Sequence, residues 1–300
     1  MIVITEFMDE AWVDWLAARA AVVYDPDLVD RTDATIEAAR GARALIVRNR
    51  TQVRGPLLDA GFEVVGRLGV GLDNIDLDGC AARGIAVIPA AGANALAVAE
   101  YVLTAAATLR RGAYALRGAM EAGDWPRSEA GRGREMAGAT LGLVGYGAIA
   151  RETARLARGW GMAVIAHDPY AADFEGAEST GLPDLLARAD VVSLHVPLTD
   201  ATRRLIDAAA LGAMRPGAVL VNAARGGVVD EAALADALRD GRLAGAALDV
   251  FEDEPLGPGH PFAGAPNLIL TPHVAGVTRE ANARVSEMVA RRVAAHLGLG

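Results

Sequence analysis

Short apolar runs alternate with segments of helical period along almost the whole chain, and this alternation constrains the fold most strongly. Runs of four or five apolar residues between turn residues are typical of strands buried on both faces. The amphipathic segments between them are long enough to be crossover helices, which predicts an α/β protein with parallel sheets. The predicted strands cover residues 2–5, 21–24, 44–47, 64–68 and 86–88 in a first series, and residues 141–144, 163–166, 191–194, 218–221, 245–248 and 268–270 in a second.

Two domains are expected, because 300 residues with 52% apolar side chains can fill two cores. The five strands of the first series predict a small doubly wound unit, and the six of the second suit a dinucleotide-binding fold. A long helix predicted over residues 94–121 joins the two series. A last helix, over residues 278–297, follows the sixth strand of the second series.

Charge and composition exclude several classes of function. The net charge is −9, so the basic surface that nucleic acid requires is not supplied, and no nucleic-acid partner is expected. All 29 basic residues are Arg, which rules out lysine-dependent chemistry such as a Schiff base or a P-loop.

The single cysteine, Cys80, permits no internal disulfide and no cysteine-based metal site, and none of the residues predicts a metal. Residues 1–6 lack the character of a signal peptide, and the apolar stretch 93–109 is too short for a membrane span, so a cytoplasmic protein without a membrane partner is expected.

A glycine motif follows the first strand of the second series. It reads GxGxxA, with Gly145 for the tight turn, Gly147 for close approach to a pyrophosphate, and Ala150 for packing of the next helix. The amino end of that helix attracts phosphate. Asp168 ends the following strand, where a carboxylate can bind both hydroxyls of a ribose and repel a 2′-phosphate. The motif therefore predicts NAD rather than NADP, although Asp168-Pro169 could also form only a turn.

Three polar residues stand at or just after the ends of the last strands, on the side where open α/β sheets bind ligands. They are Arg225, Glu254 and His273. A histidine whose cationic form is stabilised by a carboxylate can take and return the hydroxyl proton of a 2-hydroxy acid. The planar guanidinium of Arg225 can hold the substrate carboxylate and polarise the carbonyl oxygen. Each residue alone has an ordinary structural explanation, but together they describe a catalytic mechanism.

Several separate motifs, in order along nearly the whole chain, then point to one family. They are residues 69–76, residues 94–100, the glycine loop, His195-Val196-Pro197-Leu198-Thr199, residues 222–230, residues 247–251 and Pro272-His273. With them the sequence resembles the D-isomer-specific 2-hydroxyacid dehydrogenases, and most closely the branch of 3-phosphoglycerate and sulfolactate dehydrogenases. The resemblance implies an NAD-dependent oxidoreductase in which Arg225, Glu254 and His273 are catalytic.

The family architecture further implies a Rossmann domain, residues 93–276, inserted in a smaller flavodoxin-like substrate domain of residues 1–92 and 277–300. It also implies a homodimer formed by the dinucleotide domain. Asp249 is expected to meet the nicotinamide carboxamide. The complete set of cofactor-binding residues implied is Gly145, Tyr146, Gly147, Ala148, Ile149, Asp168, His195, Val196, Pro197, Thr202, Ala223, Ala224, Arg225, Asp249, His273 and Gly276.

The substrate is expected to be a small acid with a second anionic group. In phosphoglycerate dehydrogenases the residues matching Arg48 and Arg67 bind the substrate phosphate, and Arg50 is an additional basic residue here. The resemblance also implies that the amides of Val70 and Gly71 bind the substrate carboxylate and that Asn94 lines the nicotinamide side. Phosphate and sulfonate both fit an arginine cluster, so 3-phosphoglycerate is expected first and sulfolactate next. Alternatively, Arg48 pairs with a carboxylate such as Asp73 or Glu100, and the substrate is a plain lactate-like acid.

Two other functions are compatible with parts of the pattern. A glyoxylate or hydroxypyruvate reductase shares the fold and the three catalytic residues, but such enzymes commonly prefer NADPH, against which Asp168 counts. A non-catalytic protein that responds to NAD shares the dinucleotide site, but it has no need for the set of Arg225, Glu254 and His273.

Overall fold

The computed structural model describes residues 1–300, which form two compact units. Unit 1 consists of Met1–Asn94 and Val277–Gly300, and unit 2 consists of Ala95–Gly276. The second unit is thus an insertion in the first. No helix combines the length and the apolar character that crossing a bilayer requires.

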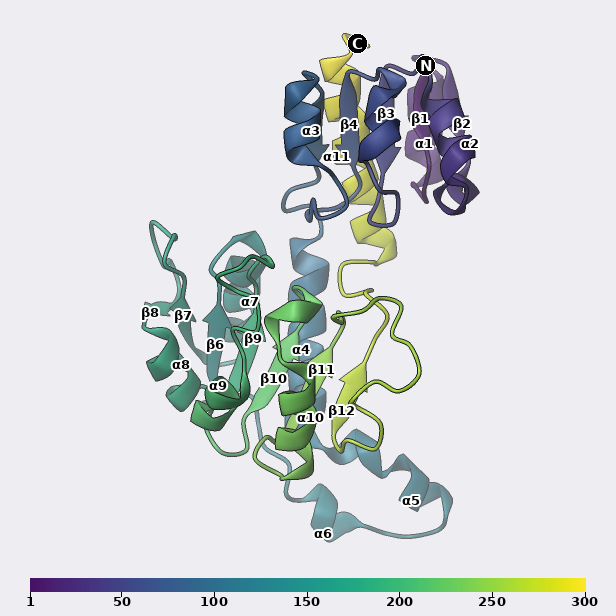
Figure 1. Ribbon diagram of the computed structural model, residues 1–300. Coiled ribbons are helices and arrows are strands. Elements are labelled where there is room, and N and C mark those ends of the chain that lie inside the picture. The colour runs from purple at the N-terminus through teal and green to yellow at the C-terminus, as the bar shows by residue number, and fades with distance from the viewer. The chain divides into compact units, whose positions relative to one another are not determined.

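Unit 1 contains a five-stranded parallel sheet in the order β2-β1-β3-β4-β5, which is the flavodoxin-like order (Figure 1). Its strands are β1 (Ile2–Ile4), β2 (Val22–Tyr24), β3 (Ala44–Val47), β4 (Val64–Arg67) and β5 (Ala86–Pro89). Its helices are α1 (Glu10–Ala17), α2 (Thr32–Ala39), α3 (Leu77–Ala82) and α11 (Arg279–His296), with short 3-10 helices η1 (Pro26–Asp30) and η2 (Gly55–Ala60).

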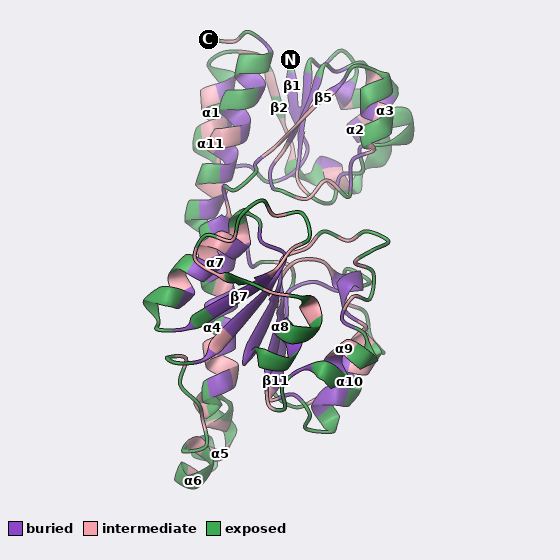
Figure 2. Cartoon of the chain, turned by 90° about the vertical axis from the view of Figure 1, so that its left-hand side faces the viewer, coloured by how far each residue is buried: buried purple, intermediate pink, exposed green.

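Both faces of this sheet are covered, α1 and α11 lying on one face and α2 and α3 on the other (Figure 2). Successive residues of a strand point to opposite faces, so Ile2 and Ile4 join the core under α11 while Val3 joins the core under α3. Burial on both faces explains why the strands are continuous apolar runs. The helix α11 returns from the end of unit 2 and contributes Val285, Val289 and Val293 to unit 1.

Unit 2 contains a seven-stranded parallel sheet in the order β12-β11-β10-β9-β6-β7-β8. Strand order reverses at β6, as in dinucleotide-binding folds, where ligands bind at the carboxyl ends beside this reversal. The strands are β6 (Thr140–Val144), β7 (Ala163–His167), β8 (Glu178–Ser179), β9 (Val191–Leu194), β10 (Val219–Asn222), β11 (Gly245–Leu248) and β12 (Leu268–Leu270). The helices are α4 (Ala95–Arg111), α5 (Arg117–Glu121), α6 (Arg127–Ala130), α7 (Ala148–Gly159), α8 (Leu182–Arg188), α9 (Ala208–Ala213) and α10 (Glu231–Arg239), with η3 (Ala113–Leu116) and η4 (Gly226–Val228).

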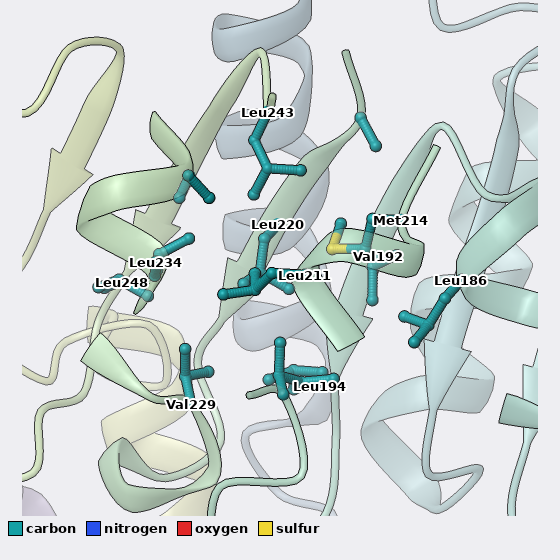
Figure 3. Packing of buried hydrophobic residues seen from close by; sticks show 14 of the residues in the cluster. Leu186, Val192, Leu194, Leu211, Met214, Leu220, Val229, Leu234, Leu243 and Leu248 are labelled. Carbon is teal, nitrogen blue, oxygen red and sulfur yellow. The ribbon is translucent and has the colours of Figure 1, made fainter. Parts of the chain in front are cut away.

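The sheet of unit 2 has a core on each face. Helices α4 and α7 cover one face, and α8, α9 and α10 cover the other (Figure 2). Figure 3 shows the second core, where Val192, Leu194 and Leu220 of the central strands meet Leu211 and Leu234 from the helices. Close packing of branched side chains makes the strand ends a rigid base for the loops that follow them.

The predicted fold class is confirmed, and two details of it were wrong. The sheet of unit 2 has a seventh strand, β8, of only two exposed residues, too short to give a pattern of its own. The helix predicted to continue to residue 121 ends at Arg111, because Gly112 adopts a left-handed φ of 65°. The following α5 and α6 extend away from the sheet of unit 2 (Figure 1).

Candidate active site

The glycine loop at the end of β6 is shaped by a close approach of two backbones. Gly145 has a left-handed φ of 92°, and a Cβ there would lie 2.5 Å from the carbonyl oxygen of His195, at the end of β9. Only glycine permits both the conformation and the contact. The loop is thereby placed at the point where β6 and β9 diverge, which is the ligand-binding position of this fold.

The amino end of α7 offers space beside the loop. Gly147 is the residue before the helix, no side chain caps the helix there, and nothing lies within 4 Å of the position of a Cβ on Gly147. The first amides of a helix have no partners within it and carry a partial positive charge. Ala150, one turn in, is completely buried against the sheet. The residues therefore fit a pyrophosphate, which would occupy the space that a side chain at 147 would fill.

Asp168 follows β7 beside the glycine loop. Its Oδ2 accepts a 2.8 Å hydrogen bond from the Tyr146 amide, and its Oδ1 accepts a hydrogen bond of the same length from the Tyr170 amide. The carboxylate is half-buried and held next to the loop, as a ribose ligand would need. Tyr146 itself is not brought to the site, because its ring is buried against Phe174 and its hydroxyl donates to the Glu175 carbonyl.

His195 follows β9 and is partly enclosed by the loop. Its Nε2 lies 3.0 Å from the Ser193 hydroxyl, and desolvation lowers the pKa of the ring to about 4. The ring is therefore neutral at pH 7. Its neighbour Thr202 closes the following turn, since its hydroxyl donates to the Pro197 carbonyl and accepts from the Thr199 amide. Both residues thus shape the loop after β9.

The depressed pKa of His195 predicts a pH dependence of stability. Between pH 6.5 and pH 4 the unfolded chain binds a proton on this ring and the folded chain does not, so the free energy of unfolding falls as the pH falls through this range. The difference of roughly 2.5 pH units corresponds to about 3 kcal/mol. Urea unfolding of the wild type should show this loss, and His195→Asn should show a flatter curve. An identical slope in the variant would remove His195 as its source.

Arg225 stands just after β10, on a turn that cannot accept a side chain at the next position. A Cβ on Gly226 would lie 1.9 Å from the backbone carbonyl of Phe251, after β11. The loops after β10 and β11 are therefore in backbone contact. The side chain of Asn222 fixes the turn by donating to the Arg225 carbonyl and accepting from the Ala224 amide.

Glu254 and His273 form a hydrogen-bonded pair from the loops after β11 and β12. Nδ1 of His273 lies 2.8 Å from Oε2 of Glu254, while Oε1 accepts from the Phe251 amide at 3.1 Å. Burial alone would raise the pKa of the Glu254 carboxyl, but the hydrogen bond and charge of His273, with the Phe251 amide and Arg225, bring it below its usual value. A carboxylate only accepts, so Nδ1 carries the hydrogen and Nε2 is left for another partner.

Asp249 is held by the loop that follows β12. It is 1% exposed, and it accepts from the Thr271 hydroxyl and from the amides of Val274 and Ala275. The His273 amide donates to its carbonyl. These bonds hold the loop in which His273 adopts a left-handed φ of 56°. Asp249 therefore anchors the histidine loop, and its contact with the nicotinamide carboxamide stays a prediction.

In unit 1 the carboxyl ends of β3 and β4 carry Arg48 and Arg67. The guanidinium of Arg48 is half-buried, donates to Oδ1 of Asn282 on α11 at 3.0 Å and lies 5.7 Å from the centre of the Phe7 ring. Burial lowers the pKa of Arg48, and the charge of Glu6 opposes that effect. The Glu6 carboxylate also accepts a hydrogen bond from the Arg48 amide, so the side chain and the backbone of Arg48 have separate partners in unit 1.

Arg67 lies over the loop that follows β4. A Cβ on Gly69 would collide with its guanidinium, so glycine at this position lets the side chain fold across the backbone. The amides of Val70 and Gly71, next in the chain, donate to no group of the protein. A guanidinium and two available amides in one loop are suited to a carboxylate or a similar anion.

Two other predicted substrate residues behave differently. Arg50 pairs with Asp30 of η1 on the surface, both side chains being more than half exposed. Asn94 has a buried Oδ1 without a hydrogen bond in the chain, which leaves an acceptor for a ligand donor. The sequence prediction missed Glu6 and Asn282, which contact Arg48, and Thr271, which links Asp249 to the Tyr101 hydroxyl.

Comparison with known proteins agrees with this arrangement. Residues 103–275 match the family model described as D-isomer specific 2-hydroxyacid dehydrogenase, NAD binding domain. The chain is 52% identical to an (S)-sulfolactate dehydrogenase of Chromohalobacter salexigens over 99% of its own length and 98% of that protein. The chain belongs to the D-isomer specific 2-hydroxyacid dehydrogenase family.

Two further comparisons describe the range of this dehydrogenase's relatives. A D-3-phosphoglycerate dehydrogenase of Archaeoglobus fulgidus is 34% identical over 97% of this chain, which spans 56% of that protein. The structure of a D-lactate dehydrogenase from Aquifex aeolicus, complexed with NAD and lactic acid, superposes with a TM-score of 0.86 at 27% identity. That comparison covers 99% of this chain and 96% of the other. The protein is an NAD-dependent 2-hydroxyacid dehydrogenase, which corrects the alternative of a non-catalytic protein.

Proposed function

We propose that the dehydrogenase interconverts (S)-sulfolactate and 3-sulfopyruvate with NAD. The observation that carries the proposal is the half-buried guanidinium of Arg48, which donates to Asn282 at the end of the unit 1 sheet where Arg67 also lies. A substrate with one anionic group has no use for this guanidinium in addition to a carboxylate site. Similarity to the sulfolactate dehydrogenase over almost the full length of both proteins supports a sulfonate as the second anion.

His273 is the proposed acid and base. When NAD is bound, it supplies the acceptor for the hydride that leaves the substrate carbon. Nε2 of His273 takes the hydroxyl proton as the carbonyl forms and returns it in the opposite direction. Glu254, bound to Nδ1 at 2.8 Å, fixes the ring and stabilises its cationic form. Arg225 is proposed to hold the substrate carboxylate and to polarise the reacting oxygen.

The residues of unit 1 are proposed to bind the substrate's two anionic ends. The Val70 and Gly71 amides are assigned to the carboxylate, and Arg48 and Arg67 to the sulfonate. Arginine is suited to a sulfonate because its planar set of donors can serve two oxygen atoms at once. Arg50 stays outside this set, since its pairing with Asp30 already satisfies its charge.

The stereochemical descriptor of the proposed substrate agrees with a D-specific family. In lactate the carboxyl carbon outranks the methyl carbon, but in sulfolactate the carbon that bears sulfur outranks the carboxyl carbon. The same spatial arrangement is therefore named R in D-lactate and S in sulfolactate. One orientation of hydroxyl and hydrogen at the reacting carbon serves both acids, and the catalytic residues need no rearrangement to act on (S)-sulfolactate.

The choice of NAD over NADP is assigned to Asp168. Its carboxylate lies beside the glycine loop, where it can accept from the ribose hydroxyls and would repel a 2′-phosphate. This preference also counts against the glyoxylate or hydroxypyruvate reductase alternative, whose usual cofactor carries that phosphate.

The wider context completes the proposal. A homodimer formed by unit 2 is favoured by the exposed aromatic rings of Tyr114 and Trp125, at 73% and 76%, on the segment that extends from its sheet. A reducing compartment such as the cytoplasm suits the single, buried Cys80.

The test is NADH oxidation by the purified protein with 3-sulfopyruvate, 3-phosphohydroxypyruvate, hydroxypyruvate, pyruvate and glyoxylate. We expect kcat/KM for 3-sulfopyruvate to exceed that for pyruvate and glyoxylate by about 100-fold, which corresponds to about 3 kcal/mol of binding to the second anion. A preference for 3-phosphohydroxypyruvate would make the protein a phosphoglycerate dehydrogenase. A preference for glyoxylate or pyruvate would contradict a second anion site altogether.

A further inference from the structure

Glu6 is a buried carboxylate with no part in the chemistry above. It follows β1 and is 5% exposed. Its Oε1 accepts from the amides of Arg48 at 2.8 Å and Thr51 at 3.0 Å, and its Oε2 accepts from the Arg50 amide at 3.2 Å. The turn of residues 48–51 is thus folded around one carboxylate.

The opposite side of this turn is fixed as well. Nδ2 of Asn74 donates to the carbonyls of Arg48 at 3.0 Å and Thr51 at 2.7 Å. The hydroxyls of Thr5 and Thr51 lie 2.9 Å apart. The amides of the turn donate to Glu6 and its carbonyls accept from Asn74. The backbone at Arg48 therefore has little freedom to move.

The charge of Glu6 has a second consequence. A carboxylate near an anion site would repel the ligand if its charge were free, but three amides take up the negative charge of Glu6 through charge-assisted hydrogen bonds. What remains is a favourable interaction with the Arg48 guanidinium, which is partly removed from water. Glu6 can therefore support the cation without competing for it in an ion pair.

We propose that Glu6 is a positioning residue for recognition of the substrate's second anionic group, because it holds the 48–51 turn that directs the Arg48 guanidinium. Glu6 does not touch the substrate itself. This inference rests on the assignment of Arg48 in the proposed function, and the experiment below separates the two.

The first variant is Glu6→Gln, which keeps the size of the side chain but turns an NH2 group toward an amide N–H. We expect KM for 3-sulfopyruvate to rise about tenfold while kcat changes by less than about threefold, and KM for glyoxylate to stay unchanged. The matched control is Asp9→Asn, which removes the same charge nearby. The Asp9 carboxylate accepts from the Ala11 amide at the start of α1, and an Asn side chain serves that role equally well, so no kinetic change is expected.

A double-mutant cycle decides whether Glu6 acts through Arg48. In an Arg48→Gln background, Glu6→Gln should raise KM for 3-sulfopyruvate by less than about twofold, because the residue it positions is gone. A tenfold rise in that background, or an equal rise for glyoxylate in the single variant, would overturn the proposal.

Hydrogen exchange of the Arg48, Arg50 and Thr51 amides gives a readout that needs no substrate. These amides should exchange faster in Glu6→Gln and at the wild-type rate in Asp9→Asn. Glu6→Asp, whose shorter side chain cannot reach all three amides, takes its place if Glu6→Gln does not fold. Unchanged exchange refutes the role of Glu6. A wild type without preference for 3-sulfopyruvate refutes instead the proposed substrate.

Discussion

His273→Ala is expected to lower kcat by about 100-fold or more while the Kd for NADH changes by less than about twofold. The imidazole is the only group in the pair with Glu254 that can both take and return a proton at neutral pH. Its Nδ1 is occupied by Glu254 at 2.8 Å, so one ring nitrogen is held and the other is available. The glycine loop and Asp168, which are assigned the pyrophosphate and the ribose, are left unchanged in this variant, which is why binding of NADH should survive. Steady-state kinetics and NADH fluorescence titration measure the two quantities.

Glu254→Gln tests the same pair from the other side. An amide oxygen can still accept the hydrogen on Nδ1, but the NH2 group then faces the Phe251 amide, and the neutral side chain no longer stabilises the imidazolium. We expect a loss in kcat of at least about tenfold. Glu252→Gln is the matched control, because Glu252 is exposed on the same loop and its nearest cation is Arg204, at 3.9 Å. Equal kcat values for the two glutamine variants would remove the Glu254–His273 pair from the mechanism.

The sequence predicts local backbone geometry best where local chemistry dictates it. Gly145 and Gly147 are needed wherever a strand turns directly into a helix beside a phosphate, so their spacing alone predicts the turn. Asp168 and Arg225 follow strands, and in a parallel sheet every such residue lies at the same edge. Recognising the strands was therefore sufficient to place both residues at the carboxyl edge of the unit 2 sheet.

The features of the site that the sequence does not predict depend on contacts between segments distant in the chain. Asp249 and Glu254 are both acids after β11, and nothing in the sequence says that one will bind the amides of the loop after β12 while the other meets His273. Arg50 is also an arginine that follows β3, yet it forms an ion pair with Asp30, whereas Arg48 contacts Asn282. Tyr146 stands within the glycine motif, but its ring fills the core beside Phe174. Such assignments follow from tertiary packing.

The contrast between Arg48 and Arg50 yields the second prediction. Arg48→Gln should lower kcat/KM for 3-sulfopyruvate by about 100-fold and leave that for glyoxylate within about twofold, since the guanidinium meets only the end of the substrate that glyoxylate lacks. Loss of a half-buried, charge-assisted contact accounts for a change of this size, about 3 kcal/mol. Arg48→Lys should recover only part of it, because an ammonium cannot present the planar pair of donors.

Arg50→Gln is the matched control for this prediction, because it removes the same charge two residues away. The Arg50 guanidinium forms an exposed ion pair with Asp30, and exposed ion pairs contribute little to stability. We therefore expect kcat/KM for 3-sulfopyruvate to stay within about twofold of the wild type. If long-range attraction of the anion by the positive charges of Arg48 and Arg50 were responsible for selectivity, the two variants would lose kcat/KM equally, and both losses would shrink at high salt. A loss confined to Arg48 and insensitive to salt instead requires direct contact, because only a desolvated, oriented guanidinium distinguishes two arginines so close in the sequence.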